Sequence, residues 1–261
     1  MNKIMNAFEN KKALLGFLTA GDPTFEASCE NILAMAKAGA DLIEIGIPFS
    51  DPIAEGPVIQ AANIRALSKG MTTDRAFDLV ERVRKDTNVP VCFMTYLNPV
   101  FKYGYDRFFS RCAELGIDGL ICPDMPFEEK EEAAEVARKY DVSVISLIAP
   151  TGEERIKMIA ESAEGFLYIV PPIGGTGSCG DFISVMQSVK RYAKIPSAIG
   201  SEISTPEQAK QIVDISDGVI IGSSAVSLVE RYGENAAPKI YEYVKCLADA
   251  VHGDTQSSVV C

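Results

Sequence analysis

The sequence contains no tryptophan and only one histidine, His252, which lies near the C-terminus. A lone histidine in a polar terminal segment is expected to be solvated. Ser-His-Asp triads, imidazole general bases and histidine-rich metal sites all need a histidine inside the fold, so they are excluded. The chemistry must come from carboxylates, hydroxyls, lysine, arginine or backbone dipoles.

Long apolar runs and paired-cysteine motifs are also missing. No run approaches the ~20 apolar residues that cross a bilayer. The apolar run 13–20 follows two lysines, as in a signal peptide, but the turn and helical pattern after it favour a first strand. The seven cysteines are odd in number, scattered and without CxxC spacing. This pattern favours reduced thiols and a cytoplasmic location over a disulfide framework.

Positive charge is scarce, with 25 Lys and Arg against 36 Asp and Glu and a formal net charge of -11. An acidic surface argues against nucleic acid and anionic membranes as partners. It does not exclude a small anionic ligand, because such a ligand needs only one local site.

Short apolar runs alternate with amphipathic helical stretches along the whole chain. Eight runs are typical of buried parallel strands, at residues 14–20, 41–46, 91–96, 119–124, 142–149, 165–170, 196–201 and 218–223. This alternation predicts a (β/α)8 TIM barrel. A doubly wound open sheet is the alternative, although no GxGxxG follows the first run.

The ends of the chain complete this prediction. We expect a short extra N-terminal helix over residues 3–12 and a closing helix over residues 235–251. The barrel is expected to form a single domain over residues 1–251, followed by a disordered C-terminal tail over residues 252–261.

Two carboxylates stand out where a barrel places its active site, at the carboxyl ends of the strands. Glu44 interrupts the apolar run LIEIG, and Glu55 follows on a loop rich in proline and glycine. A buried carboxylate without a partner has a raised pKa, which suits a general acid or base. The alternative is a structural glutamate paired with a buried cation. No basic residue lies at the neighbouring strand ends, which favours the catalytic role.

Glycine-rich turns precede two of the later helices, at residues 174–177 (GGTG) and 222–224 (GSS). Backbone N–H groups in such turns form anion sites at helix N-termini. The last strand ends of a TIM barrel are its usual phosphate corner, so the turns predict a phosphorylated substrate.

Residues 43–67, IEIGIPFSDPIAEGPVIQAANIRAL, resemble the signature of the tryptophan synthase alpha chain family. The segments FLTAGDP, MTYLNPVFKYG, GLICPDMPFEE and SDGVIIGSS support the resemblance. It implies a TIM barrel that cleaves indole-3-glycerol phosphate to indole and glyceraldehyde 3-phosphate by a retro-aldol route. It also implies an αββα complex, in which a beta chain carries pyridoxal phosphate and joins the indole to serine. This chain itself would need no cofactor and no metal.

The resemblance also implies roles by position. Glu44 would transfer protons to the indole ring carbon and the glycerol hydroxyls, and Glu55 would hold the indole N–H. The other implied residues are Phe17, Ile59 and Tyr96 in the indole pocket, Tyr168 beside the first glutamate, Thr176 and Gly177 in a closing loop, Gly200, Gly222 and Ser223 at the phosphate corner, and Asp51 and Asp124 facing the beta chain or ordering the loops.

The sequence departs from the family pattern in three segments. Glu55 replaces an aspartate, Glu202 replaces a glycine at the phosphate corner, and Pro171-Pro172 replace polar and basic residues. Two hypotheses therefore remain: a working lyase, or a catalytically weakened subunit that binds and activates a beta chain. An unrelated phosphate-binding barrel isomerase is a third, which the long match around IPFSDP disfavours.

Overall fold

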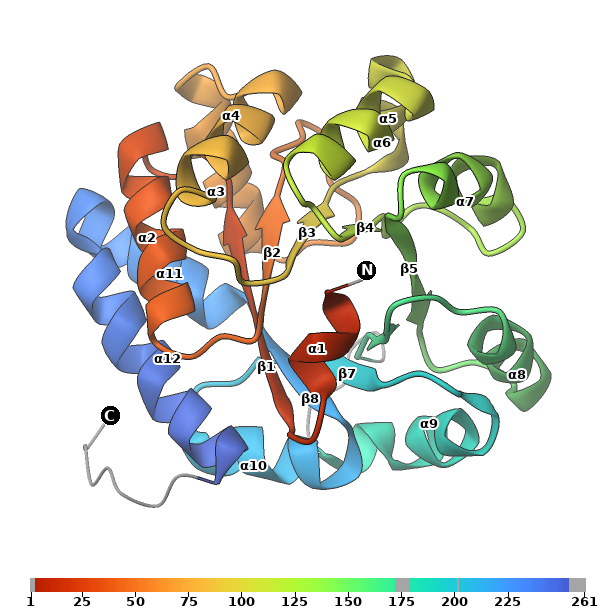
Figure 1. The fold of residues 1–261 in the computed structure, drawn as a ribbon. Helices are drawn as coiled ribbons and strands as arrows, with labels where there is room; N and C mark the ends of the chain where they lie inside the picture. Colours follow the sequence, from red (N-terminus) through yellow and green to blue (C-terminus); the bar gives the residue numbers. More distant parts are fainter. Residues whose placement is uncertain (1–2, 172–178, 201, 254–261) are drawn as a thin grey trace.

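Eight parallel strands close into a barrel in chain order in the computed structural model, which describes residues 3–171, 179–200 and 202–253 (Figure 1). The strands are β1 (Ala13–Thr19), β2 (Leu42–Gly46), β3 (Val91–Met94), β4 (Gly119–Ile121), β5 (Ser143–Ile148), β6 (Leu167–Ile169), β7 (Ser197–Gly200) and β8 (Gly218–Ile221). Because β1 pairs with β8, the barrel prediction is confirmed and the open sheet was wrong.

Helices surround the barrel and cover its strands (Figure 1). They are α1 (Ile4–Phe8), α2 (Phe25–Lys37), α3 (Pro57–Ser68), α4 (Thr73–Val83), α5 (Leu97–Tyr103), α6 (Tyr105–Glu114), α7 (Lys130–Lys139), α8 (Glu153–Glu161), α9 (Cys179–Tyr192), α10 (Pro206–Ile215), α11 (Ser223–Tyr232) and α12 (Ala237–His252), with a 3-10 turn at Gly233–Asn235. The extra N-terminal helix predicted over residues 3–12 is therefore present as the shorter α1.

Helix α1 closes the amino end of the barrel. Its buried residues Ile4 and Ala7 join the cluster of side chains that fills the barrel interior, and the ring of Phe8 lies 5.8 Å from that of Phe166. The amino end is thus occupied by apolar packing, which leaves the carboxyl end as the open mouth.

Strand alternation decides which side chains reach that mouth. Alternate strand residues face either the barrel interior or the surrounding helices. In β2, Leu42 belongs to the interior cluster, whereas Ile43 and Ile45 pack with the helices. Glu44 and Gly46 share the parity of Leu42 and face the interior.

The C-terminal predictions need two corrections. Helix α12 runs to His252, so the tail predicted over residues 252–261 was wrong at residue 252, and residues 254–261 lie outside the described residues. His252 is not a solvated residue either. Its Nε2 lies 2.7 Å from Asp41 Oδ2, and its side chain is only 22% exposed. The division into one domain over residues 1–251 stays a prediction.

Four described cysteines agree with the prediction of reduced thiols. Cys29, Cys92, Cys112 and Cys122 are free and buried, and they pack as small core residues. Cys246 is disulfide-bonded, so the prediction of reduced thiols is wrong at that position. Among the described residues, no helix is long and apolar enough to cross a membrane.

An aromatic cluster between the barrel and its helices predicts a large stability effect. The ring of Phe77 lies 5.2 Å from that of Phe93 and 5.3 Å from that of Phe108, and Phe77 is fully buried. Phe77→Ala should therefore lower the free energy of unfolding by about 3–5 kcal/mol in urea titrations. The control is Phe101→Ala, which removes a ring that is 64% exposed. Equal losses in both variants would contradict the packing described.

Candidate active site

A cavity of about 1170 Å³ opens at the carboxyl ends of the strands. It brings together seven of the residues that the sequence predicted for the site, namely Phe17, Glu55, Ile59, Tyr168, Gly200, Gly222 and Ser223. These residues come from β1, β6 and β7, from the loop and helix that follow β2, and from the turn and helix that follow β8, so only the closed barrel makes them neighbours. Glu202, which replaces a glycine of the family pattern, also lines the cavity.

Glu44 lies in the barrel interior directly beside this cavity. In the strand register it pairs with Phe17 of β1 on one side and with Cys92 of β3 on the other. The residue is completely buried, and neither carboxylate oxygen has a hydrogen-bond partner among the described residues. Burial raises the pKa of Glu44 to about 8. The alternative of a structural ion pair is therefore wrong for the described part of the chain.

Glu55 has a different environment, since its carboxylate is held by hydrogen bonds. Asn63 of α3 donates from Nδ2 to Glu55 Oε2 at 2.6 Å. Burial raises the pKa of Glu55, and hydrogen bonds from Asn63 and Tyr96 oppose that rise. The two carboxyl groups thus differ in kind, because one is buried and unpartnered while the other is half-buried and oriented.

The apolar wall of the cavity depends on close approaches that glycine permits. Phe17, Ile59 and Val226 belong to one apolar cluster at the barrel mouth. A Cβ on Gly46 would lie 2.6 Å from Phe17 Cζ, so only glycine lets that ring lie across β2. In the same way, a Cβ on Gly200 would lie 3.0 Å from the hydroxyl oxygen of Tyr168.

Tyr96 has a supporting position instead of a cavity-lining one. Its hydroxyl oxygen accepts a hydrogen bond from the Ala54 backbone N–H at 3.0 Å, and its ring packs 5.3 Å from that of Phe49. Tyr96 therefore braces the loop that carries Glu55.

The phosphate corner predicted from the glycine turns is partly described. Gly222 caps α11 without any side-chain hydrogen bond, and Ser223 begins that helix. The first N–H groups of a helix with no capping side chain are available to an anion. Glu202 has an exposed side chain at this same corner. Thr176 and Gly177 lie outside the described residues.

The two predicted partner-facing aspartates have different environments. Asp51 is exposed on the loop after β2, where its Oδ2 accepts a hydrogen bond from Ser50 at 2.5 Å. Asp124 instead accepts from the Leu97 backbone N–H at 2.8 Å, which ties the loop after β4 to the start of α5. Of the two predicted roles, loop ordering fits Asp124 and an exposed contact fits Asp51.

Sequence reasoning missed Asn63 as a site residue. It is only 3% exposed and lies eight positions after Glu55, in the helix that follows the loop. A polar residue on the buried face of that helix, among Ala62 and Ala66, is the signal that could have revealed it. In the described part of the chain, no three His, Cys, Asp or Glu side chains meet as they would to hold a metal ion.

The raised pKa of Glu44 predicts that the free energy of unfolding falls as pH rises. Its folded pKa of about 8 exceeds the ordinary value of 4.5, so the folded chain retains a proton that the unfolded chain loses between these values. Stability conferred by protonated Glu44 is therefore present at low pH and is lost as pH rises.

Glu44→Gln should remove this dependence, because glutamine resembles the protonated acid. Its free energy of unfolding should match the wild-type value near pH 5 and exceed it at pH 8, the gap growing by about 1.4 kcal/mol per pH unit. Urea titrations at several pH values measure the gap, with the exposed Glu135→Gln as control. A gap that is flat with pH would show that Glu44 is ionised in the folded chain.

The comparisons with known proteins agree with this geometry. The family model described as "Tryptophan synthase alpha chain" matches residues 4–252. A curated protein of that name from Lacticaseibacillus casei is 47% identical over 99% of both chains, and one from Geobacillus stearothermophilus is 42% identical over 93% of this chain and 96% of its own.

Solved structures give the same result. The tryptophan synthase subunit alpha of Legionella pneumophila str. Paris superposes with a TM-score of 0.90 at 35% identity, covering 97% of this chain and 99% of its own. A structure titled for the tryptophan synthase a2b2 complex of Pyrococcus furiosus gives a TM-score of 0.83 at 32% identity, covering 91% of this chain and 98% of that chain. Because the family model matches residues 4–252, which is nearly the whole of this chain, the chain belongs to the tryptophan synthase alpha chain family.

Proposed function

We propose that Glu44 and Glu55 are the two catalytic carboxylates of the lyase reaction of this family, in which indole-3-glycerol phosphate is cleaved to indole and glyceraldehyde 3-phosphate. The observation that carries the proposal is the complete burial of Glu44, without a counter-charge among the described residues, beside the cavity that Glu55 lines. Such a pair of unlike carboxyl groups suits acid–base chemistry on one substrate.

Glu44 begins the reaction as the acid. Its pKa of about 8 keeps the carboxyl group protonated at neutral pH, so it can donate a proton to the indole ring carbon that bears the glycerol chain. The resulting carboxylate then accepts the proton of the adjacent glycerol hydroxyl. The carbon–carbon bond breaks as that hydroxyl becomes the aldehyde, and the bonding electron pair restores the aromatic ring.

Glu55 stabilises the intermediate of this sequence. Protonation of the ring carbon places positive charge on the indole nitrogen, and a carboxylate that accepts the indole N–H stabilises that charge. The hydrogen bond from Asn63 at 2.6 Å orients the carboxylate and favours its ionised form. Glutamate at this position carries the same charge as the aspartate of the family pattern, on a side chain one methylene longer.

The rest of the cavity would select the substrate. Phe17, Ile59 and Tyr168 offer an apolar and aromatic wall for the indole ring. The uncapped start of α11 at Gly222 and Ser223 offers backbone N–H groups to the phosphate. In this arrangement the scissile bond would lie between the two, near Glu44.

The surface around the mouth supports the beta chain as partner. Ile53 is 79% exposed and Phe101 is 64% exposed, on the loop after β2 and on α5. Large exposed apolar side chains are typical of an interface, and Asp51 lies on the same loop as Ile53. The beta chain would contribute pyridoxal phosphate, and a cytoplasmic location suits a biosynthetic enzyme of this kind.

Indole release tests the proposal directly. The purified chain should release indole from indole-3-glycerol phosphate, faster in the presence of a beta chain, and Glu44→Gln should reduce kcat by about 10²–10⁴-fold. The exposed Glu135→Gln is the control. Raised beta-chain activity with no indole release by the wild-type chain would instead establish the weakened, activating subunit.

A second test addresses Glu202, whose exposed carboxylate at the phosphate corner favours the weakened subunit. Repulsion of the substrate phosphate by this carboxylate should raise KM, so Glu202→Gln should lower KM by about 5–10-fold, as expected for screened charges several ångströms apart. The matched control is Glu207→Gln, an exposed glutamate at the start of α10 that does not line the cavity. An unchanged KM in Glu202→Gln would mean that the carboxylate points away and that backbone N–H groups alone bind the phosphate.

A further inference from the structure

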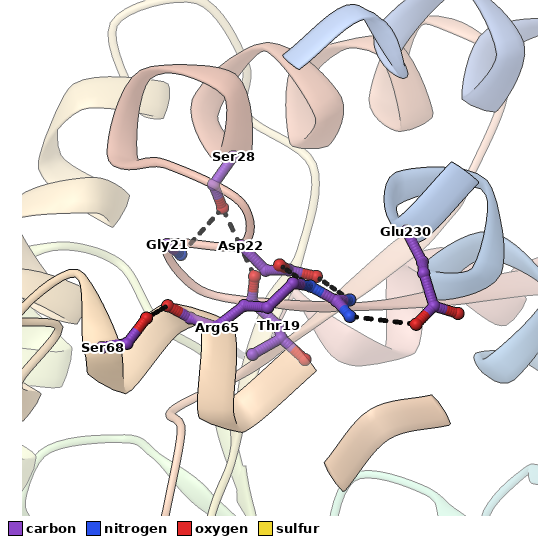
Figure 2. Close-up of polar contacts among 7 residues, drawn as sticks. All are labelled: Thr19, Gly21, Asp22, Ser28, Arg65, Ser68 and Glu230. Atoms are coloured by element: carbon purple, nitrogen blue, oxygen red, sulfur yellow. Dashed lines mark hydrogen bonds and ion pairs between the residues drawn. The ribbon is translucent and has the colours of Figure 1, made fainter. Parts of the chain in front are cut away.

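Arg65 contacts two carboxylates, Asp22 and Glu230, and so connects three segments of the chain (Figure 2). Arg65 of α3 donates from Nε to Asp22 Oδ1 at 2.8 Å and from Nη2 to Asp22 Oδ2 at 2.9 Å. Its Nη1 also reaches Glu230 Oε1 of α11 at 3.2 Å. Asp22 follows β1, so one guanidinium joins β1, α3 and α11.

The contact to Asp22 is the strong part of this cluster. The Asp22 side chain is 2% exposed and that of Arg65 is 29% exposed, whereas that of Glu230 is 52% exposed. A bidentate guanidinium–carboxylate pair is both stronger and more directional than a single hydrogen bond. The exposed contact to Glu230 is screened by water and contributes little.

Neither member of the pair touches the cavity. Arg65 and Asp22 are both absent from the residues that line it. Arg65 lies two positions after Asn63 on α3, which places the two side chains on roughly opposite sides of the helix. Any effect of the pair on the reaction must therefore pass through the position of α3.

The position of Glu55 depends on α3. Gln60 Nε2 donates to the Glu55 carbonyl oxygen at 2.7 Å, and Asn63 Nδ2 donates to the Glu55 carboxylate at 2.6 Å. Both donors belong to α3, so a shift of the helix moves the main chain and the carboxylate of Glu55 together.

Apolar packing fixes helix α3 only in part. Its fully buried residues Ala62, Asn63 and Ala66 are small or polar, and small side chains bury little apolar area. Two larger side chains near its start, Val58 and Ile59, are partly buried and pack at the barrel mouth. The bidentate pair between Arg65 and Asp22 adds a directional polar contact to this packing, in the second half of the helix.

We infer that Arg65 and Asp22 are positioning residues, which fix α3 against β1 so that Asn63 holds Glu55 at the distance from the indole nitrogen that the reaction needs. The inference rests on the role proposed above for Glu55. A misplacement of ~1 Å can cost about 10²-fold in rate. The longer side chain of glutamate at this position has more rotamer freedom, so its anchoring matters more.

The experiment measures kcat and KM for indole release by the full chain with a beta chain. Arg65→Gln should reduce kcat by about 10–100-fold and change KM by less than about threefold, because the phosphate and ring contacts persist. Arg65→Lys should recover only part of kcat, because an ammonium cannot bind both oxygens of Asp22. The matched control is Arg138→Gln, which breaks another bidentate pair, with Glu131 on the outer surface.

A double-mutant cycle separates positioning from general destabilisation. If Arg65 acts through Asn63, then Arg65→Gln combined with Asn63→Ala should be no slower than the slower single variant. Losses that multiply would overturn the inference. So would a folded Arg65→Gln variant with kcat within about twofold of wild type.

A second readout does not depend on catalysis. The side-chain amide resonance of Asn63 in ¹⁵N NMR reports its hydrogen bond to Glu55, and it should move in Arg65→Gln or Arg65→Lys but not in Arg138→Gln. A resonance unchanged in the Arg65 variants would overturn the inference. A wild-type chain that releases no indole would defeat the proposed function alone, and the resonance would still decide the role of Arg65.

Discussion

The burial of one carboxyl group without a counter-charge is the constraint on which the site depends. An ionised carboxylate in the barrel interior would be costly, so Glu44 holds its proton to about pH 8. The barrel provides that burial through strands on both sides and apolar packing beneath. Glu55 lines the neighbouring cavity, where it is half-buried and its carboxylate is oriented by a hydrogen bond from Asn63. Two glutamates can thus have different roles because the fold gives them different surroundings.

The fold was predictable because its signals are local and repeated. All eight apolar runs became strands, with bounds that differ by at most a few residues. The burial of Glu44 was predictable for the same reason, since a charged residue inside a strand pattern must face the interior or disturb the packing. The chain termini were less predictable. The contact of His252 with Asp41 joins residues 211 positions apart, and no local pattern indicates such a contact.

The site was predictable only in part, and the misses share a cause. The residues that line the cavity follow from strand ends and from the family resemblance. Asn63 donates a hydrogen bond to Glu55, and Arg65 donates to Asp22. The sequence does not reveal these partners, because the contact of Arg65 forms only when α3 lies beside the loop after β1. The fully buried apolar residues of α3 are only the small Ala62 and Ala66, so its apolar pattern does not show which side of the helix faces the barrel. Polar contacts that cross between elements therefore remained hidden where the apolar pattern was weakest.

The lone buried carboxyl group also has a consequence for the movement of protons through the catalytic cycle. In the proposed sequence Glu44 gives one proton to the ring carbon and receives one from the glycerol hydroxyl, so it ends as it began. The reaction then needs no proton from bulk water and returns none to it. The cleavage step can therefore be completed while the site is closed to solvent, and access is needed only for substrate to enter and for products to leave.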